Sequence, residues 1–217
     1  MLKYNPFTNT FDYFEPNINT FGDISGGDYS EFESDGTLKF VGEATIWNDA
    51  NIGSAQLSLP AVSFPSEAQF VDNTGTNTGI YTLAFSVGDK VSGEVEIPHS
   101  YKEGSDYYFH VHWQGIAAPT GTEKVQWQLD YAIGKKDTTL APKSTITIET
   151  DFDTQYSFVI SAFAAISGSG IKIGDQFLFT LTRIAASVSE YSGAALIATV
   201  GIHYEADTVG SRNIATK

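Results

Sequence analysis

From residue 37 onward, apolar side chains recur at every second position, and this alternation limits the fold more than any other feature of the sequence. In "KVQWQLDYA", Val125, Trp127, Leu129 and Tyr131 alternate with polar residues. A period of two is typical of β-strands that bury one face. Gly, Pro, Asn, Asp or Ser turns bound each run, and the other runs are "TLKFVGEATIW", "IYTLAFSV", "VSGEVEI", "DYYFHVHW", "STITIET", "QYSFVISA", "DQFLFTLTRI" and "AALIATVGIHYE".

These runs predict about nine strands at the spacing of sandwiches and barrels. No stretch has a convincing helical period, and 217 residues are commonly one all-β domain. Residues 48–78 are predicted to form a long irregular loop, which is usually functional or packed against a neighbour. The strand count and the long connections favour an all-β, jelly-roll-like antiparallel β-sandwich over a meander.

The first 35 residues mix aromatic side chains with Asn, Thr, Gly and Asp and have no sustained period. They are either a flexible tail or an extended peptide that docks on another surface, and the lone aromatic residues favour docking. We therefore predict an N-terminal anchoring segment at residues 1–35 and a β-sandwich domain at residues 36–217. The predicted anchor residues are Tyr4, Pro6, Phe7, Phe11, Tyr13 and Phe14.

The charge balance excludes several kinds of partner. Twelve basic and 26 acidic residues give a formal net charge of −14, which repels nucleic-acid phosphates. No cysteine is present, so disulfides and thiolate metal sites are excluded. No apolar run approaches the length of a membrane helix, and the first residues do not resemble a signal peptide. We expect no nucleic-acid or membrane partner and synthesis in a cytoplasm.

The stretch "DYYFHVHWQG" holds two of the four histidines, His110 and His112. Both lie on the strand face opposite the apolar residues, so their imidazoles point the same way and could chelate one metal ion. The simpler interpretation is packing or hydrogen bonding at a subunit interface, and we predict neither a metal nor any other cofactor. His203, on the last strand, comes near His110 only if those two strands pair.

Other candidate chemistry is sparse. Glu149, Asp151 and Asp153 alternate in "ETDFDTQ" and could hold Ca²⁺, although an acidic solvated turn explains them as well. Trp113 and Trp127 alternate with apolar residues and are expected in the core rather than against a sugar ring. The sequence has no serine-hydrolase elbow, zincin, Walker or Rossmann motif. We expect no enzymatic activity and no catalytic residue, although paired carboxylates of a glycosidase are assembled only by the fold.

Two regions together resemble a family of structural proteins from tailed bacteriophage virions. The leader "KYNPFTNTFDYF" resembles the start of tail-fibre and head-fibre proteins. The body matches through "IWNDANI", "GIYTLAF", "EVEIPHSYKEGSDYYFHVHW", "VQWQLDYAIG" and "IHYEADTVGSR", which span most of residues 40–212. The resemblance implies a virion component of fibre, collar-spike or capsid-decoration type, located in the virion and made in the host cytoplasm.

Three functions follow as hypotheses. The first is a structural virion protein, a homotrimer that its N-terminal segment anchors to capsid, portal, collar or tail proteins. The second is a binding module whose long loop at residues 48–78 and exposed Tyr and Asn residues recognise a glycan of the host surface. The third is a virion glycan hydrolase, which would need two carboxylates in a groove. Exposed aromatic residues in a cleft favour the second, and clustered apolar surface favours the first.

Overall fold

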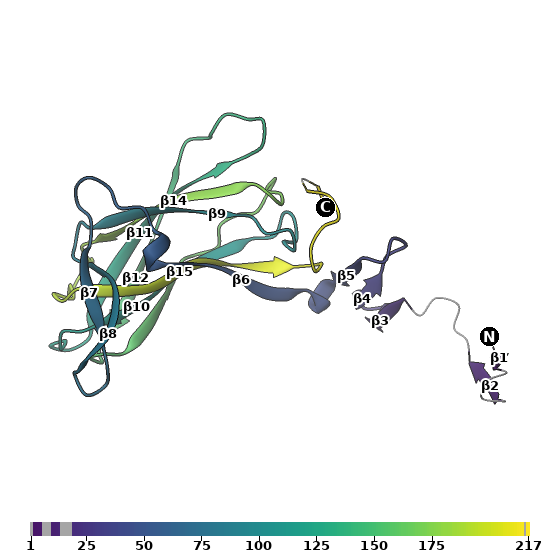
Figure 1. Cartoon of the computed structure of the whole chain (residues 1–217), viewed down its shortest axis with the longest axis horizontal. Coiled ribbons are helices and arrows are strands. Elements are labelled where there is room, and N and C mark those ends of the chain that lie inside the picture. The colour runs from purple at the N-terminus through teal and green to yellow at the C-terminus, as the bar shows by residue number, and fades with distance from the viewer. Residues whose placement is uncertain (1, 6–9, 14–18, 215) are drawn as a thin grey trace.

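The structure, a computed structural model, describes residues 2–5, 10–13, 19–214 and 216–217, and the side chains from residue 19 onward. Ten strands form the two sheets of a β-sandwich, and five short strands precede them (Figure 1). The short strands are β1 (Leu2–Asn5), β2 (Thr10–Tyr13), β3 (Thr20–Asp23), β4 (Asp28–Phe32) and β5 (Leu38–Val41). The sandwich strands are β6 (Ile46–Gly53), β7 (Ser66–Val71), β8 (Asn77–Phe85), β9 (Lys90–Glu96), β10 (Tyr107–Gly115), β11 (Glu123–Gly134), β12 (Ser144–Phe152), β13 (Phe158–Ala162), β14 (Gln176–Ile184) and β15 (Ala195–Ala206).

The strand order is that of a jelly roll. The larger sheet runs β13-β10-β15-β8-β7, and the smaller sheet runs β12-β11-β14-β9. All the ladders are antiparallel. Strands β8 to β15 thus give four-stranded orders of 8-15-10-13 and 9-14-11-12, the two interleaved Greek keys of that fold. Strand β7 extends the larger sheet, and β6 pairs with the second half of β15. The predicted jelly-roll-like antiparallel β-sandwich is confirmed.

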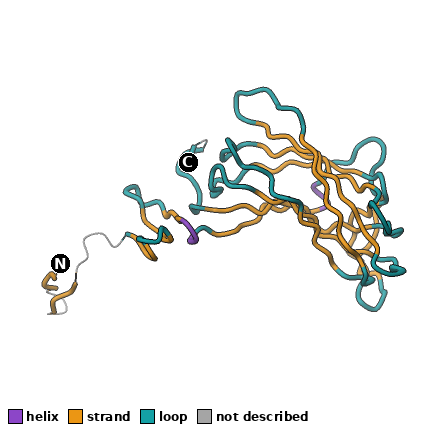
Figure 2. The backbone as a smooth tube through the Cα atoms, turned by 180° about the vertical axis from the view of Figure 1, so that it is seen from behind, coloured by secondary structure: helices purple, strands orange, loops and turns teal. Residues whose placement is uncertain are grey.

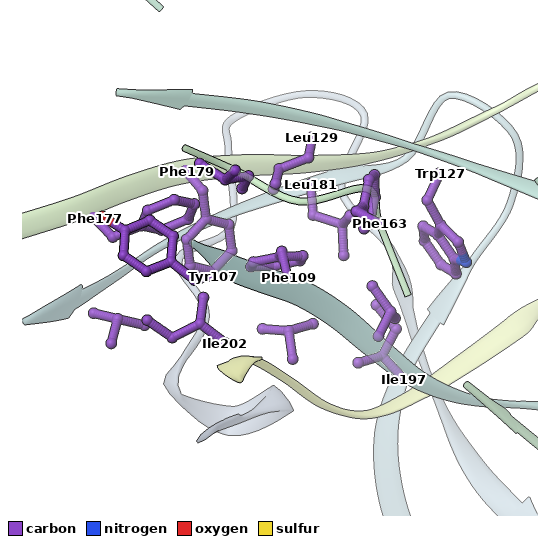
Figure 3. Close-up of a cluster of buried hydrophobic side chains, with 14 of the residues drawn as sticks. Tyr107, Phe109, Trp127, Leu129, Phe163, Phe177, Phe179, Leu181, Ile197 and Ile202 are labelled. Atoms are coloured by element: carbon purple, nitrogen blue, oxygen red, sulfur yellow. The ribbon is translucent and has the colours of Figure 1, made fainter. Parts of the chain in front are cut away.

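The core lies between the two sheets and follows the predicted alternation. On β10, Tyr107, Phe109, Val111 and Trp113 are all fully buried. Strand β11 faces them with Val125, Trp127 and Leu129, and β14 adds Phe177, Phe179 and Leu181 (Figure 3). Both tryptophans that were expected in the core, Trp113 and Trp127, have no exposed surface. Burial of these large side chains is the main stabilising contribution.

The predicted irregular loop at residues 48–78 is wrong. This stretch contains most of β6, all of β7 and the start of β8, together with a short 3₁₀ turn, η2 (Ser54–Gln56). Strand β6 lies at an edge of the sheet, and its first four residues are all exposed. It therefore lacks the alternation of apolar and polar residues by which a strand is recognised in the sequence. The alternation in "IYTLAFSV" predicts that Tyr81 and Phe85 share one face of β8, but the two side chains are not buried alike, because Tyr81 is 59% exposed while Phe85 is fully buried.

Two small sheets precede the sandwich. Strands β1 and β2 form a hairpin, and β3, β4 and β5 form a three-stranded sheet, followed by the 3₁₀ turn η1 (Gly42–Ala44). The three-stranded sheet spans the predicted boundary at residue 35 and lies beyond one end of the sandwich (Figure 2). The division of the chain into an anchor at residues 1–35 and a domain at residues 36–217 stays a prediction.

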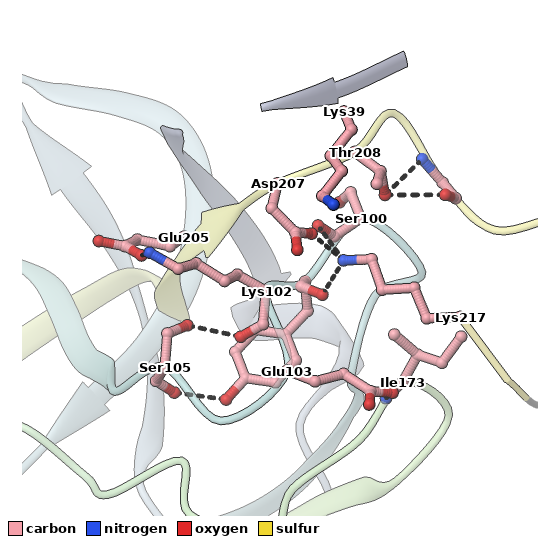
Figure 4. A network of polar contacts seen from close by, with 12 residues as sticks. Lys39, Ser100, Lys102, Glu103, Ser105, Ile173, Glu205, Asp207, Thr208 and Lys217 are labelled. Atoms are coloured by element: carbon pink, nitrogen blue, oxygen red, sulfur yellow. Dashed lines mark hydrogen bonds and ion pairs between the residues drawn. The ribbon is translucent and has the colours of Figure 1, made fainter. Parts of the chain in front are cut away.

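Polar contacts at the end of β15 connect the sandwich with the three-stranded sheet and with the C-terminal residues. The backbone N–H of Phe40 donates to the carbonyl of Asp207 over 2.7 Å. Lys217 forms an ion pair with the carboxylate of Asp207, and Lys102 pairs with Glu205 at 2.5 Å (Figure 4). These contacts are half-exposed and therefore contribute modestly to stability.

Helical structure in the described ranges amounts to the two short 3₁₀ turns. Within those ranges, no helix has the length and apolar character needed to cross a membrane.

Candidate functional site on the outer face of the larger sheet

The face of β10 that points away from the core carries Tyr108, His110 and His112, as the alternation predicted. Strand β10 pairs with β15, which answers the open question about His203. In that register Tyr108 lies opposite His203, and His203 in turn lies opposite Asp49 of β6. Three neighbouring strands therefore present their polar side chains on one patch of the outer face.

The patch brings two histidines and a carboxylate together. Nε2 of His203 lies 2.8 Å from Oδ1 of Asp49. The ring of His110 stacks on that of His203, with centroids 4.1 Å apart and planes at 19°. One ligand atom from each of Asp49, His110 and His203 lies within 4.8 Å of the other two. The side chains of His203 and Asp49 are 41% and 43% exposed, so solvent reaches this cluster.

His110 is the buried member of the cluster. It has no exposed surface, and among the described residues neither ring nitrogen has a hydrogen-bond partner. Burial, followed by the charges of His203 and His112, lowers the pKa of His110 to about 4. The imidazole is therefore neutral near neutral pH, with one nitrogen free to accept a bond.

Gly201 of β15 makes room for this arrangement. In the ladders it lies between His110 of β10 and Asn51 of β6. A Cβ atom at this position would lie 2.6 Å from the carbonyl oxygen of Ala50 and would also collide with Oδ1 of Asn51. The missing side chain lets the neighbouring side chains close over the strand.

Two aromatic side chains border the cluster. Trp47 of β6 is 58% exposed, and its ring meets that of Tyr108 edge to face, with centroids 5.6 Å apart. Trp47, Tyr108 and His203 line an open pocket of about 340 Å³. The pocket is thus largely apolar, with two aromatic walls, and its third lining residue, His203, pairs with Asp49 beside it.

The other predicted candidates lie elsewhere. His112 contacts His110, with ring centroids 5.0 Å apart, but it is not part of the compact group of ligand atoms. Glu149 and Asp151, predicted as possible calcium ligands, both pair with Lys124, at 3.1 and 3.2 Å. That lysine compensates their charge, which favours the ordinary interpretation of an acidic surface.

The predicted anchor residues are only partly described. Tyr4 lies on β1, and Phe11 and Tyr13 lie on β2, where the backbone alone is described. Pro6, Phe7 and Phe14 lie outside the described residues. Their role as an anchor stays a prediction.

Sequence reasoning missed Asp49 because it assigned the stretch from residue 48 to a loop, whereas Trp47, at the end of the predicted strand run "TLKFVGEATIW", was already one of three tryptophans that could stack on a sugar ring. The available signal was the run "TIWNDANI", in which Trp47, Asp49 and Asn51 alternate on one face once the segment is a strand. The pattern is weak because an edge strand has few apolar residues to mark its inner face.

No protein-family model and no curated protein sequence matches this chain. Among solved structures, one similar chain holds the CBM22-1 and GH10 modules of xylanase 10B from Clostridium thermocellum in complex with xylohexaose. It has 14% identity and a TM-score of 0.41, and the match covers 77% of this chain and 30% of that one.

A second similar structure is the CBM36-1 domain of a multidomain xylanase from the hindgut metagenome of Trinervitermes trinervoides. It has 13% identity, a TM-score of 0.37 and coverage of 71% and 96%. A third is the ANX2 ectodomain of Arabidopsis thaliana, with 11% identity, a TM-score of 0.38 and coverage of 83% and 54%. All three similarities are distant.

Proposed function

We propose that this protein is a glycan-binding module that belongs to a bacteriophage virion. The observation that carries the glycan-binding part is the open pocket of Trp47, Tyr108 and His203. A large aromatic side chain that is 58% exposed is costly in water and is typical of a surface that meets a ligand.

The chemistry of the pocket suits a sugar. A pyranose ring has an apolar C–H face that packs on an aromatic ring, while its hydroxyl groups need polar partners around the rim. Trp47 and Tyr108 supply the aromatic surface, and His203 and Asp49 supply a donor and an acceptor 2.8 Å apart. A small open pocket of this kind accommodates one or two sugar rings rather than a buried substrate.

The charge of the protein selects among glycans. The formal net charge of −14 disfavours anionic polysaccharides such as uronate or phosphate polymers. We therefore expect neutral hexose-rich chains of a bacterial surface as the ligand class.

An array of neutral and acidic bacterial polysaccharides tests this assignment. We expect the purified protein to bind neutral members, and Trp47→Ala to weaken that binding at least about tenfold, or roughly 1.4 kcal/mol. Trp47 lies outside the core, so the variant is expected to fold normally.

The matched control is Phe158→Ala, which removes a similarly exposed aromatic side chain from β13, outside the pocket. It is expected to bind like the wild type. Binding that Phe158→Ala abolishes and Trp47→Ala leaves intact would move the site away from β6, and an array with no bound member would contradict the assignment.

A different observation favours the virion part of the proposal. Among the described side chains, all the residues of the buried core lie at Leu57 or later, so residues 19–45 do not help to form it. A segment that the core does not need is free to attach the domain to another protein. The resemblance of "KYNPFTNTFDYF" to phage fibre leaders suggests that this other protein is a virion component.

Particle incorporation tests the attachment. Deleting residues 2–18 removes the six predicted anchor residues and leaves β3 to β15 intact. We expect unchanged thermal unfolding and loss of the protein from purified particles of the phage that encodes it, measured by immunogold labelling. Normal labelling of particles assembled with the truncated chain would rule out this anchor.

A further inference from the structure

The three side chains of the cluster on the outer face are all of types that commonly bind metal ions. Asp49, His110 and His203 come from three strands that are adjacent in the sheet, β6, β10 and β15. Their ligand atoms already lie within 4.8 Å of one another. Convergence from three separate strands fixes the donors on rigid elements, as a binding site requires.

His110 supplies an independent indication that this cluster binds a ligand. A neutral imidazole carries one N–H donor and one acceptor nitrogen, and a buried polar group without a partner costs roughly 1–3 kcal/mol. Both nitrogens of His110 are buried and lack a partner among the described residues. The ring stacks on His203, so an added ligand would meet both side chains.

Two imidazoles and one carboxylate select the kind of ligand. Imidazole suits zinc, copper, iron and nickel, whereas calcium and magnesium prefer an all-oxygen set. A site with two histidines and one carboxylate leaves further coordination positions open for water or an external ligand. Of the three donors, His203 also lines the pocket beside Trp47 and Tyr108.

We propose that Asp49, His110 and His203 bind one divalent first-row transition-metal ion, with zinc as the reference ion. The ion takes the place of the proton on Nε2 of His203, that proton moves to Nδ1 so that the imidazole stays neutral, and the ion takes over the contact with Asp49. His110 contributes a nitrogen that has no competing partner. This inference does not rest on glycan binding.

The metal-bound geometry requires a rearrangement. In the tetrahedral geometry of zinc, bonds of roughly 2.0–2.2 Å place two ligand atoms about 3.3–3.6 Å apart, so ligand atoms that lie up to 4.8 Å apart have to move closer together. The parallel rings of His110 and His203 cannot both direct lone pairs at one ion, so one ring has to turn. His203 is half-exposed and borders the pocket, which gives it room to rotate.

Calorimetric titration of the EDTA-treated full chain with Zn²⁺ tests the site. We expect one zinc per chain and a higher unfolding temperature with zinc, because the ion binds the folded state. Asp49→Asn and His203→Gln alter half-exposed side chains and should preserve the fold. Each should weaken zinc binding by more than the roughly 10- to 100-fold that loss of an outer-shell partner costs.

His112→Asn is the matched control, because it removes a neighbouring histidine that is not in the ligand group. It should retain zinc affinity within a few-fold of wild type. Wild-type protein that binds no zinc, or zinc binding that survives both Asp49→Asn and His203→Gln, would overturn the proposal. So would loss of binding in His112→Asn with retention in Asp49→Asn.

The two proposals fail separately. Zinc binding is measured without any sugar, and Trp47→Ala leaves all three ligands in place. If the protein binds zinc but no glycan, only the proposed function is contradicted. If it binds a glycan in EDTA but does not bind zinc, only the metal site is contradicted.

Discussion

His110 is the residue at which burial and chemistry conflict most. A fully buried imidazole without a protein partner is a liability unless a ligand or a bound water satisfies it. Three titratable side chains lie next to it: His112 on its own strand, His203 on β15 and Asp49 on β6. On the other side, the residue of β13 that pairs with His110 is Ala162, which does not titrate. The surroundings thus favour the neutral form.

This environment makes the metal-free protein sensitive to acid. The pKa of His110 is about 4 in the folded chain and near 6.5 when unfolded, so the unfolded state binds more protons between these values. The free energy of unfolding should rise from pH 4 to pH 6.5, by up to roughly 3 kcal/mol, and this contribution is constant outside that window.

Chemical denaturation in EDTA across pH 3.5–7.5 (a range chosen to bracket roughly both pKa values) measures the slope. His110→Gln should flatten this slope whatever its effect on overall stability. Equal slopes in wild type and His110→Gln would contradict the assigned pKa.

At the scale of the element, alternation was informative wherever a strand buries one face. It correctly assigned the core faces of β9, β10 and β11, since each packs an apolar face between the sheets. It failed at β6, because this edge strand is largely exposed to solvent and does not alternate a polar face with an apolar one. The cluster itself could not be predicted, because it depends on the long-range register of β6, β15 and β10.

The pairing of β6 with β15 depends on the absence of a side chain at Gly201. Gly201→Ala places a methyl group against the backbone of β6, 2.6 Å from the carbonyl oxygen of Ala50. Overpacking of this kind typically costs about 1–3 kcal/mol. We expect a lower free energy of unfolding and weaker zinc binding, because displacing β6 moves Asp49 away from His203.

Gly134→Ala is the control, since a Cβ at that strand position meets its nearest neighbour at 3.5 Å. It should change stability little. If both alanine variants unfold at the same denaturant concentration as wild type, β6 does not rest on Gly201 as described.

At the scale of the whole molecule, the sandwich exposes a second apolar region beside β8. Leu59, Val62, Phe64, Ile80 and Tyr81 are each at least 52% exposed, and several line a hollow of about 380 Å³. Exposed apolar clusters of this kind commonly mark interfaces. We propose that this region forms the interface of a homotrimer.

Light scattering coupled to size-exclusion chromatography measures the native mass. We expect a mass near three times 23.5 kDa, and dissociation when Phe64 and Tyr81 are both replaced by serine. A wild-type mass equal to one chain would exclude the trimer.

The central claim is that a glycan binds at Trp47, and the indole N–H signals in a ¹H–¹⁵N correlation spectrum test it most directly. Trp113 and Trp127 are fully buried, so Trp47 is the exposed reporter among the three tryptophans. Titrating the array's best neutral oligosaccharide should shift the Trp47 signal saturably and leave the other two in place. A bound oligosaccharide that leaves the Trp47 signal unmoved would contradict the assignment of this pocket.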